Sequence, residues 1–386
     1  MKRNWLKIAA IGLWVMLATG VCWGAAKPEP PKLAVQFANM VMEKWPDPTA
    51  IDSNGWEYNS SIVLVGIEQV YLKTKDPKYL KYIQKWVDYF IDDRGNVKFN
   101  KEANNLDHLH PGLLLLFLYE QTGQDRYKKA AMTIRREFDN QPRNAEGGFW
   151  HKQQYPNEMW ADGIYMAEPF LIKYGKLFGD REYCDNEASF QAVLFASHAQ
   201  DPKTGLLYHG WDQDRNAAWA DPRTGLSNVI WCRAMGWYMM ALVEILDDLP
   251  RTHPRYQTLR TILTKAAAGL KQVQYPVSGL WFQVLDQSYR ASNWWETSGS
   301  AMMVYVLKHA VDQGYLDESY RAVAAKGWEG VKTRVSYDEL GQPVINGAVQ
   351  GMGVQVNFEN YVNKKRLINS THGLCGVMLA GSVMEF

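Results

Sequence analysis

The sequence predicts an all-α protein, an (α/α)6 barrel of six helical hairpins with short β-hairpin loops at the pocket end. Apolar residues recur three or four positions apart through most of the 386 residues, which is the spacing of a helix with one buried face. Short turns join several of these segments in pairs, so the paired helices are antiparallel. Twelve helices in six such pairs favour a closed ring of inner and outer helices.

Glycine and aspartate mark the joints within the pairs. In 74–77, 122–125 and 178–181 a short turn separates two helical stretches, with Gly123 and Gly179 as stop signals and aspartate as the expected N-cap. The predicted helices cover residues 33–44, 58–74, 77–91, 111–122, 125–138, 162–178, 181–198, 233–246, 254–273, 296–312, 317–331 and 373–383.

The longer connections between pairs share a pattern. Each has a turn glycine, a short extended apolar piece, and then a Trp followed within two residues by a polar side chain where a helix starts. Because this order recurs, we expect Asp162, Arg233 and Glu296 to converge at one end of the barrel. Helix N-termini carry partial positive charge, so such an end, lined by aromatic rings, suits a ring-shaped ligand with a carboxylate.

The first residues have the features of a secretory signal peptide. A basic start is followed by an apolar run over 8–21 and then by small residues. We predict a signal peptide over 1–24 and a single catalytic domain over 25–386, in an exported protein whose destination is the periplasm. A lipid anchor on Cys22 is the alternative, which the bulky Val21 before it disfavours.

The charge balance excludes recognition through a broad electrostatic field. With 42 basic and 41 acidic residues the net charge is +1, so we expect neither nucleic acid nor a membrane surface, apart from such an anchor, as a partner. Beyond the signal peptide, Cys184, Cys232 and Cys375 lack the paired spacing of a disulfide framework or a zinc cluster. We predict no metal, no cofactor, and a monomer or weak dimer.

Asp162 is the candidate catalytic acid. It lies near Trp160, Tyr165 and Met166, and such neighbours exclude water from a carboxyl group, which favours its protonated form. The alternative is an ordinary helix N-cap. Asp107 has two interpretations as well: it caps the next helix, or it supplies a second negative charge that keeps Asp162 protonated.

Arg233 and two histidines are candidates for ligand binding. A guanidinium at a pocket mouth can hold a carboxylate in a bidentate pair, but it can also stack on Trp231 or Trp237 or pair with an internal acid. His151 and His209 lie in the repeated connections. The alternative for each of them is a structural histidine whose hydrogen bonds are satisfied within the fold.

Two stretches, 147–152 (GGFWHK) and 155–166 (YPNEMWADGIYM), resemble glycoside hydrolase family 105, the unsaturated rhamnogalacturonyl hydrolases, and more distantly the unsaturated glucuronyl hydrolases of family 88. The resemblance extends over essentially all of the chain after the signal peptide. It implies Asp162 as the acid/base and Asp107 as the second catalytic aspartate of the pocket. The residues that it implies to line or contact the sugar are Tyr58, His151, Trp160, His209, Trp231, Arg233 and Trp237.

The substrate implied by this resemblance is an oligosaccharide with a 4,5-unsaturated uronic acid at its non-reducing end, as polysaccharide lyases produce. Enzymes of that family hydrate the C4=C5 vinyl ether, whereas ordinary glycosidases place two carboxyls around the glycosidic bond. No cofactor takes part. Because Trp295 stands where the family often has a small residue, we expect a narrow subsite beyond the uronate.

The residues leave two other functions open. A sugar epimerase with the same barrel would use paired histidines, here His151 and His209, although such an enzyme has no need of an export signal. A non-catalytic oligosaccharide-binding protein would use the aromatic rings alone.

Overall fold

The computed structural model describes residues 32–386, which form one compact unit. The predicted signal peptide over 1–24 and the alternative lipid site at Cys22 lie outside these residues. Each of the twelve predicted helices is present, with its ends within two residues of the predicted ones, and the all-α (α/α)6 barrel is confirmed. None of the helices in residues 32–386 has the length and apolar character needed to cross a bilayer.

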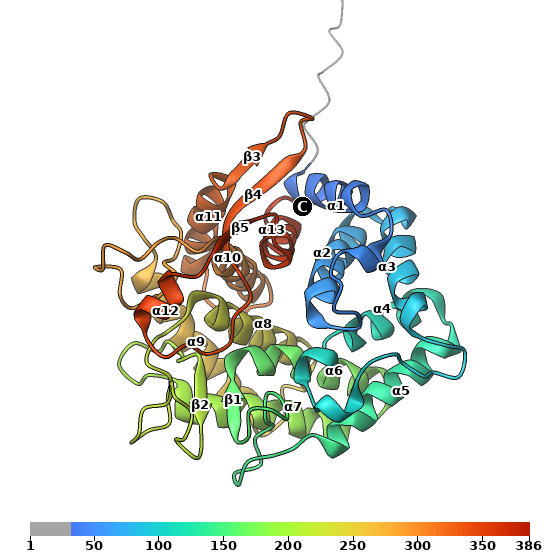
Figure 1. Cartoon of the computed structure of the whole chain (residues 1–386), viewed down its shortest axis with the longest axis horizontal. Coiled ribbons are helices and arrows are strands. Elements are labelled where there is room, and N and C mark those ends of the chain that lie inside the picture. The colour runs from blue at the N-terminus through green and yellow to red at the C-terminus, as the bar shows by residue number, and fades with distance from the viewer. Residues whose placement is uncertain (1–31) are drawn as a thin grey trace, which may run out of the picture. The chain divides into compact units, whose positions relative to one another are not determined.

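Six helices form the inner ring, and each contacts the next until the last returns to the first (Figure 1). These helices are buried on nearly all faces. Residues 112–118, for example, are all apolar, and a helix without a polar face is stable only when it is surrounded by others. The inner helices are α2 (Tyr58–Thr74), α4 (Gly112–Thr122), α6 (Ala161–Phe178), α8 (Cys232–Asp248), α10 (Thr297–Asp312) and α13 (Thr371–Met384).

The outer helices are amphipathic and cover this ring. In the first of the hairpins, Tyr79, Ile83, Trp86 and Phe90 lie three or four positions apart and are buried on one face of the outer helix. Five hairpins join an inner helix to the outer helix that follows it. The sixth pair differs from the prediction, because it joins α13 to α1 from the other end of the described chain. The outer helices are α1 (Leu33–Lys44), α3 (Pro77–Phe90), α5 (Asp125–Asn140), α7 (Arg181–Ala199), α9 (Tyr256–Val273) and α11 (Ser319–Lys332).

The predicted stop signals occupy left-handed backbone at the joints. Gly123 and Gly179 have φ angles of 67° and 86°, a region that glycine enters without strain. Asp76 caps α3 by accepting a hydrogen bond from a backbone N–H of its first turn at 3.0 Å. Asp180 precedes α7 but makes no cap hydrogen bond, since its carboxylate pairs with Arg135 at 2.9 Å.

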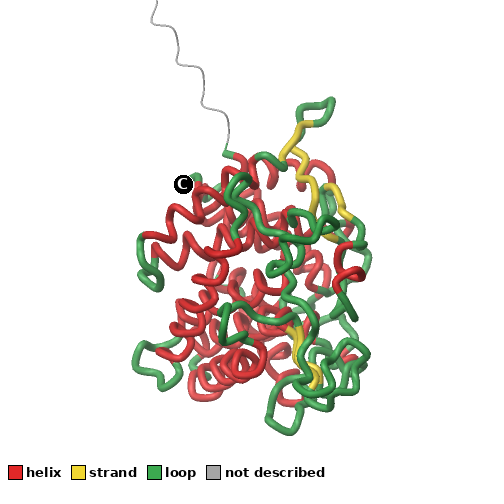
Figure 2. The backbone as a smooth tube through the Cα atoms, turned by 90° about the vertical axis from the view of Figure 1, so that its left-hand side faces the viewer, coloured by secondary structure: helices red, strands yellow, loops and turns green. Residues whose placement is uncertain are grey.

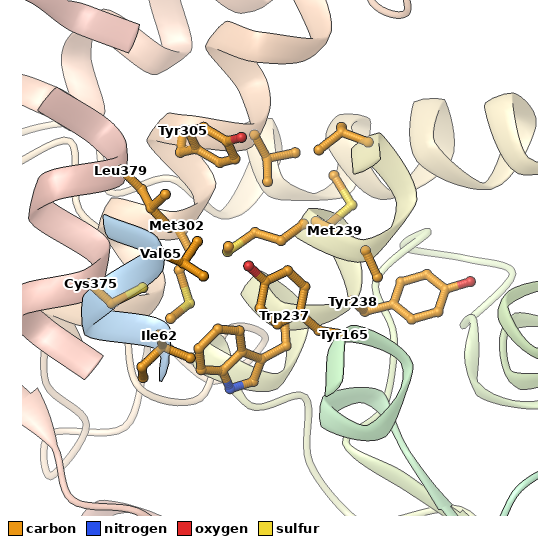
Figure 3. Packing of buried hydrophobic residues seen from close by; sticks show 14 of the residues in the cluster. Ile62, Val65, Tyr165, Trp237, Tyr238, Met239, Met302, Tyr305, Cys375 and Leu379 are labelled. Carbon is orange, nitrogen blue, oxygen red and sulfur yellow. The ribbon is translucent and has the colours of Figure 1, made fainter. Parts of the chain in front are cut away.

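Large side chains from several inner helices fill the middle of the ring. Trp237 of α8 stacks on Tyr165 of α6 with the ring centroids 5.0 Å apart, and Met302 and Ile62 lie close to this pair (Figure 3). Flexible methionine side chains fill the gaps between such rings. The ring therefore encloses a packed core and not a channel.

Short strands occupy the long connections, and Figure 2 shows them on the side of the ring where the loops gather. β1 (Glu158–Trp160) and β2 (Gly210–Asp212) are antiparallel and join two separate connections. β3 and β4 form a hairpin, and β5 extends it to a three-stranded antiparallel sheet. The sequence does not predict this sheet or α12. The remaining bounds are β3 (Val335–Tyr337), β4 (Pro343–Val349), β5 (Arg366–Ile368), α12 (Phe358–Val362) and the 3-10 helices η1 (Pro48–Ala50), η2 (Lys101–Ala103) and η3 (Leu106–His108).

Candidate active site

A cavity of about 230 Å³ opens at the N-terminal ends of the inner helices. Five of the predicted site residues line it: Tyr58, Asp107, His151, Trp160 and Asp162. They come from the starts of α2 and α6 and from the connections before α4 and α6. The cavity also has lining residues that are not among the predicted site residues, namely Asn54, Glu57, Asn59, Lys152, Tyr155, Met166, Met352 and Gly353.

A larger cavity, of about 470 Å³, lies at the opposite, C-terminal ends of the inner helices. Ion pairs line it, among them Lys173 with Glu244 at 2.6 Å and His309 with Asp247 at 2.8 Å. Five of the predicted site residues line the smaller cavity and none lines the larger one, so we place the candidate active site at the smaller cavity. In residues 32–386 no three His, Cys, Asp or Glu side chains are grouped as a metal ion would require.

Asp162 lies in the first turn of α6, but it is not the residue that caps this helix. The N-cap position belongs to Trp160, which has an extended backbone. The Oδ2 atom of Asp162 lies 3.0 Å from Nε2 of His209, and 14% of the Asp162 side chain is exposed. The N-cap alternative is therefore wrong, and the carboxyl group faces the cavity.

Strand pairing brings His209 to Asp162. Trp160 of β1 pairs with Gly210 of β2, and the backbone N–H at the start of α6 donates to the carbonyl of His209 at 2.9 Å. The His209 side chain is fully buried, and its Nδ1 atom lies 2.7 Å from the hydroxyl of Tyr361. One imidazole thus joins the candidate acid to a tyrosine from the C-terminal part of the chain.

Trp160 is held on the cavity wall by its neighbours. Its ring stacks on those of His151 and Tyr155, with centroids 4.3 and 4.8 Å away, and its indole N–H donates to Glu158 at 2.8 Å. A Cβ atom at Gly353 would lie 2.7 Å from this indole, so the chain after β4 passes in direct contact with it. Burial lowers the pKa of His151 to about 4, and this imidazole is therefore neutral near pH 7.

Asp107 is a buried carboxylate with a cationic partner. It lies in η3, with its Oδ2 atom 2.6 Å from the ammonium of Lys152 and its Oδ1 atom 3.6 Å from Nε2 of His151. Burial alone would raise the pKa of Asp107, but the Lys152 ammonium and His151 hold this pKa below its usual value. The predicted second negative charge is therefore balanced by Lys152. Asp107 does not cap α4, whose N-cap residue is Pro111.

Glu57 is an acid that lines the cavity but is not among the predicted site residues, although it stands directly before Tyr58. Burial, and then the charge of Asp107, raises the pKa of Glu57 to about 7. Tyr58 itself contacts His372, with the hydroxyl 3.3 Å from Nε2. The cavity therefore carries, in Glu57, an acid that titrates near neutral pH.

Arg233 and Glu296 are buried beside the end of β4, and neither lines the cavity. The Arg233 guanidinium donates to the carbonyls of Val349 at 2.6 Å and Gln350 at 2.7 Å. Glu296 caps α10 and accepts from the N–H of Val349 at 2.9 Å. Asp162, Arg233 and Glu296 all lie at the N-terminal ends of inner helices, as expected, but Asp162 alone of the three lines the cavity, and Glu296 is the N-cap residue of α10.

Trp231 and Trp237 lie in the core next to the site, each 1% exposed. The Trp231 ring contacts that of His209, with centroids 4.7 Å apart, and its N–H donates to Gln283 at 3.0 Å. Contact of these two rings with a sugar, and carboxylate binding by Arg233, stay predictions.

Trp295 does not line the cavity that it was expected to narrow. Its ring lies against those of Tyr275 and Phe282, with centroids 5.5 and 6.2 Å away. The aromatic residues of this connection form a cluster of their own.

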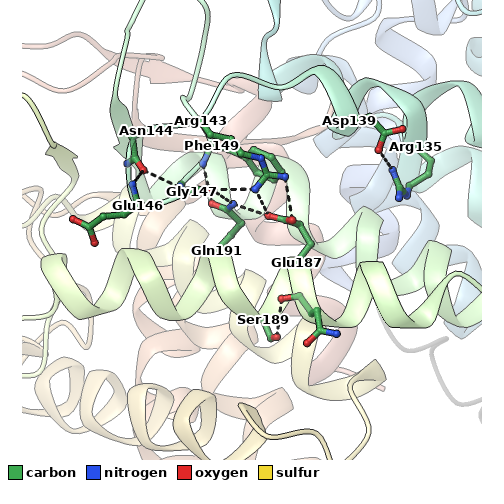
Figure 4. A network of polar contacts seen from close by, with 12 residues as sticks. Arg135, Asp139, Arg143, Asn144, Glu146, Gly147, Phe149, Glu187, Ser189 and Gln191 are labelled. Atoms are coloured by element: carbon green, nitrogen blue, oxygen red, sulfur yellow. Dashed lines mark hydrogen bonds and ion pairs between the residues drawn. The ribbon is translucent and has the colours of Figure 1, made fainter.

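A polar network attaches the connection before His151 to helix α7 (Figure 4). The side chain of Gln191 donates to the carbonyl of Gly147 and accepts from the N–H of Phe149, each at 2.9 Å. Arg143 and Glu187 form two parallel hydrogen bonds of 2.8 and 3.0 Å. The rings stacked at the cavity wall therefore follow a segment with little freedom to move.

Comparison with known proteins connects this site to a group of enzymes. The family model described as Glycosyl Hydrolase Family 88 matches residues 33–385. The structure of a C. acetobutylicum glycoside hydrolase from family 105 is 36% identical in sequence and has a TM-score of 0.86, covering 92% of this chain and 99% of that one. Two further relatives are similar in sequence. The unsaturated rhamnogalacturonyl hydrolase YesR of Bacillus subtilis is 26% identical over 335 residues, 81% of this chain and 91% of that protein, and protein Atu3128 of Agrobacterium fabrum is 37% identical over 203 residues, 51% of this chain and 84% of that protein.

These matches favour a hydrolase over the epimerase and the non-catalytic binding protein that the residues alone left open. The family model extends through the whole barrel, and the cavity lies at the inner-helix ends that the sequence pattern indicated. The chain belongs to glycosyl hydrolase family 88, close to family 105, and is an unsaturated uronyl glycoside hydrolase.

Proposed function

We propose that the enzyme releases a 4,5-unsaturated uronic acid from the non-reducing end of lyase-generated oligosaccharides of the rhamnogalacturonan or pectin type, or of a related type. In this proposal water is added across the C4=C5 vinyl ether, and Asp162 acts first as the acid and then as the base. The observation that carries the proposal is the place of Asp162 on the cavity, beside Trp160 and 3.0 Å from a buried imidazole.

The reaction needs one proton donor that becomes a proton acceptor. Asp162 gives its proton to C4, and positive charge develops on C5 and the ring oxygen. The resulting carboxylate then takes a proton from the water that attacks C5, so the acid is restored. The hemiketal formed at C5 opens, and the rest of the oligosaccharide leaves from C1.

Asp107 has a different environment, which suits a different task. Its pairing with Lys152 at 2.6 Å keeps it ionised, so it can accept hydrogen bonds from the substrate but is a poor proton donor. We therefore assign Asp107 to orienting the sugar, together with Tyr58, His151 and Trp160 on the same wall.

The proposed roles of the buried residues require a movement on binding. Arg233 would hold the C6 carboxylate, and Trp231 and Trp237 would contact the sugar. Because the guanidinium donates to the backbone after β4, residues 349–350 have to move before it can face a ligand. Loops next to active sites commonly make such movements.

The test of the proposed function is an absorbance assay on defined lyase products. The conjugated double bond of the unsaturated uronate absorbs ultraviolet light, so hydration removes the signal. Loss of absorbance together with release of the next sugar supports the proposal, and a panel of galacturonate- and glucuronate-derived products identifies the preferred substrate. Release of the next sugar with the absorbance retained would show ordinary glycosidic cleavage and refute it.

We also propose that the protein is exported to the periplasm. The support is the basic and apolar order of residues 1–24. N-terminal sequencing of the protein recovered from a periplasmic extract tests this, and an intact residue 1 in cytoplasmic material would refute it.

A further inference from the structure

Tyr361 touches the ring of His209 on the side away from Asp162, with its hydroxyl 2.7 Å from Nδ1. Both side chains are fully buried. Tyr361 lies in α12, 152 positions from His209 in the sequence, and its backbone carbonyl accepts a hydrogen bond from Gln283 at 3.1 Å. We infer that Tyr361 is a positioning residue, which fixes the tautomer of His209 so that the Nε2–H of this ring faces Asp162.

The hydrogen bonds of the Tyr361 hydroxyl determine the direction of this contact. The backbone N–H of Gln355 donates to the hydroxyl oxygen at 3.1 Å, so the hydroxyl is already an acceptor there. A buried hydroxyl also needs an acceptor for its own proton, and Nδ1 of His209 lies at hydrogen-bond distance. Nδ1 is therefore the unprotonated nitrogen, and a neutral His209 carries its hydrogen on Nε2.

The Nε2 atom of the His209 ring, with its hydrogen, therefore faces the carboxyl group of Asp162. Nε2 lies 3.0 Å from Oδ2, although the N–H direction is not that of an aligned hydrogen bond. Within residues 32–386, Oδ2 is buried and makes no aligned hydrogen bond, and the Nε2 atom of His209 is the ring nitrogen that lies beside it. The oxygen that reaches the substrate is thus Oδ1, and the N–H stabilises the carboxylate that remains after the proton has left.

The opposite tautomer would work against catalysis. With the hydrogen on Nδ1, the lone pair of Nε2 would face Oδ2 and accept the proton of Asp162. That proton would then be held by His209 and not given to C4 of the substrate. This consequence rests on the proposed function of Asp162, whereas the tautomer itself follows from the contacts of Tyr361.

The test combines spectroscopy with kinetics on the full chain. In protein labelled with ¹⁵N at its eight histidines, two-bond ¹H–¹⁵N correlations distinguish the protonated ring nitrogen from the unprotonated one. The His209 signals are assigned by their loss in His209→Gln. We expect protonated Nε2 in the unchanged enzyme and loss of this preference in Tyr361→Phe, with kcat about tenfold lower and KM changed less than threefold.

A matched control removes another buried tyrosine hydroxyl away from the site. Tyr238 is fully buried and donates to the carbonyl of Ala192 at 2.6 Å, so Tyr238→Phe should lower stability to a similar extent and leave kcat and the His209 signals unchanged. Protonated Nδ1 in the unchanged enzyme would overturn the inference, even if Tyr361→Phe failed to fold. Because the spectrum needs no turnover, that result leaves the proposed function standing, whereas full activity of Asp162→Asn would refute the proposed function whatever the tautomer.

Discussion

Gly163 is a backbone position at which one added methyl group should disturb the site. A Cβ atom there would lie 2.9 Å from Nδ1 of His151 and 3.0 Å from Cδ1 of Leu106. Comfortable contacts between such atoms are about 3.5–4.0 Å, so in Gly163→Ala the imidazole must move by about half an ångström. His151 stacks on Trp160 and contacts Asp107, so the movement spreads to the cavity wall.

The expected effects on stability and on activity differ in size. Alanine in the first turn of α6 favours the helix by up to about 1 kcal/mol, and relieving the overpacking costs about 1–3 kcal/mol. The free energy of unfolding should therefore change by less than about 2 kcal/mol. Displacing groups that orient the substrate should lower kcat/KM by about tenfold to a hundredfold.

The assay follows the ultraviolet absorbance of an unsaturated oligosaccharide in a double-mutant cycle with His151→Ala. Removing the imidazole makes room for the added methyl group, so Gly163→Ala should have little further effect in the His151→Ala background. Gly163→Ala with kcat/KM within twofold of the unchanged enzyme would refute the reasoning. An equal loss in both backgrounds would also refute it, since the effect would not act through His151.

Three further predictions concern the support of the site. Burial lowers the pKa of His151 to about 4, whereas a histidine in the unfolded chain has a pKa of about 6.5, so between these pH values the unfolded state binds more protons. The stability that this side chain contributes should therefore fall by about 3 kcal/mol from pH 6.5 to 4. Denaturant titrations of His151→Gln over this pH range should show a shallower fall than those of the unchanged protein. Glu296→Gln should lower the free energy of unfolding by about 2–4 kcal/mol, because the buried carboxylate accepts hydrogen bonds from the N–H groups of Ser298, Gly299 and Val349. A change below about 1 kcal/mol in denaturant unfolding would contradict this. Lys152→Met should leave Asp107 buried without its cation and lower kcat/KM by about tenfold or more in the absorbance assay, while Lys152→Arg retains most of the activity; equal activities of the two variants would contradict a role for the charge.

The helices of this fold are predictable because short local sequence patterns determine them. The helical period and the glycine stops gave twelve helices whose ends agree with the structure within two residues. The repeated order of Trp and a polar residue also placed Trp160 and Asp162 on the cavity wall. Lys152 and Glu57 stand next to predicted site residues, so their charges beside His151 and Tyr58 were a signal that sequence reasoning did not use.

The C-terminal part of the site could not be predicted in the same way. β3, β5 and α12 have three to five residues each, too few to show a period, and β5 is held by pairing with β4 across the sheet. Contacts such as that of Tyr361 with His209 join residues 152 positions apart. Glu296 shows the limit of pattern matching, because the repeated order placed it at the N-terminus of an inner helix but did not show that it caps this helix and lies outside the cavity wall.

The most direct test of the account is the turnover of Asp162→Asn on an unsaturated oligosaccharide, followed by the loss of ultraviolet absorbance. An amide has no proton to give to C4, so we expect an unchanged melting temperature and a kcat lower by at least about a hundredfold. A folded Asp162→Asn protein that keeps more than about a tenth of the kcat would contradict the assignment of this carboxyl group as the proton source.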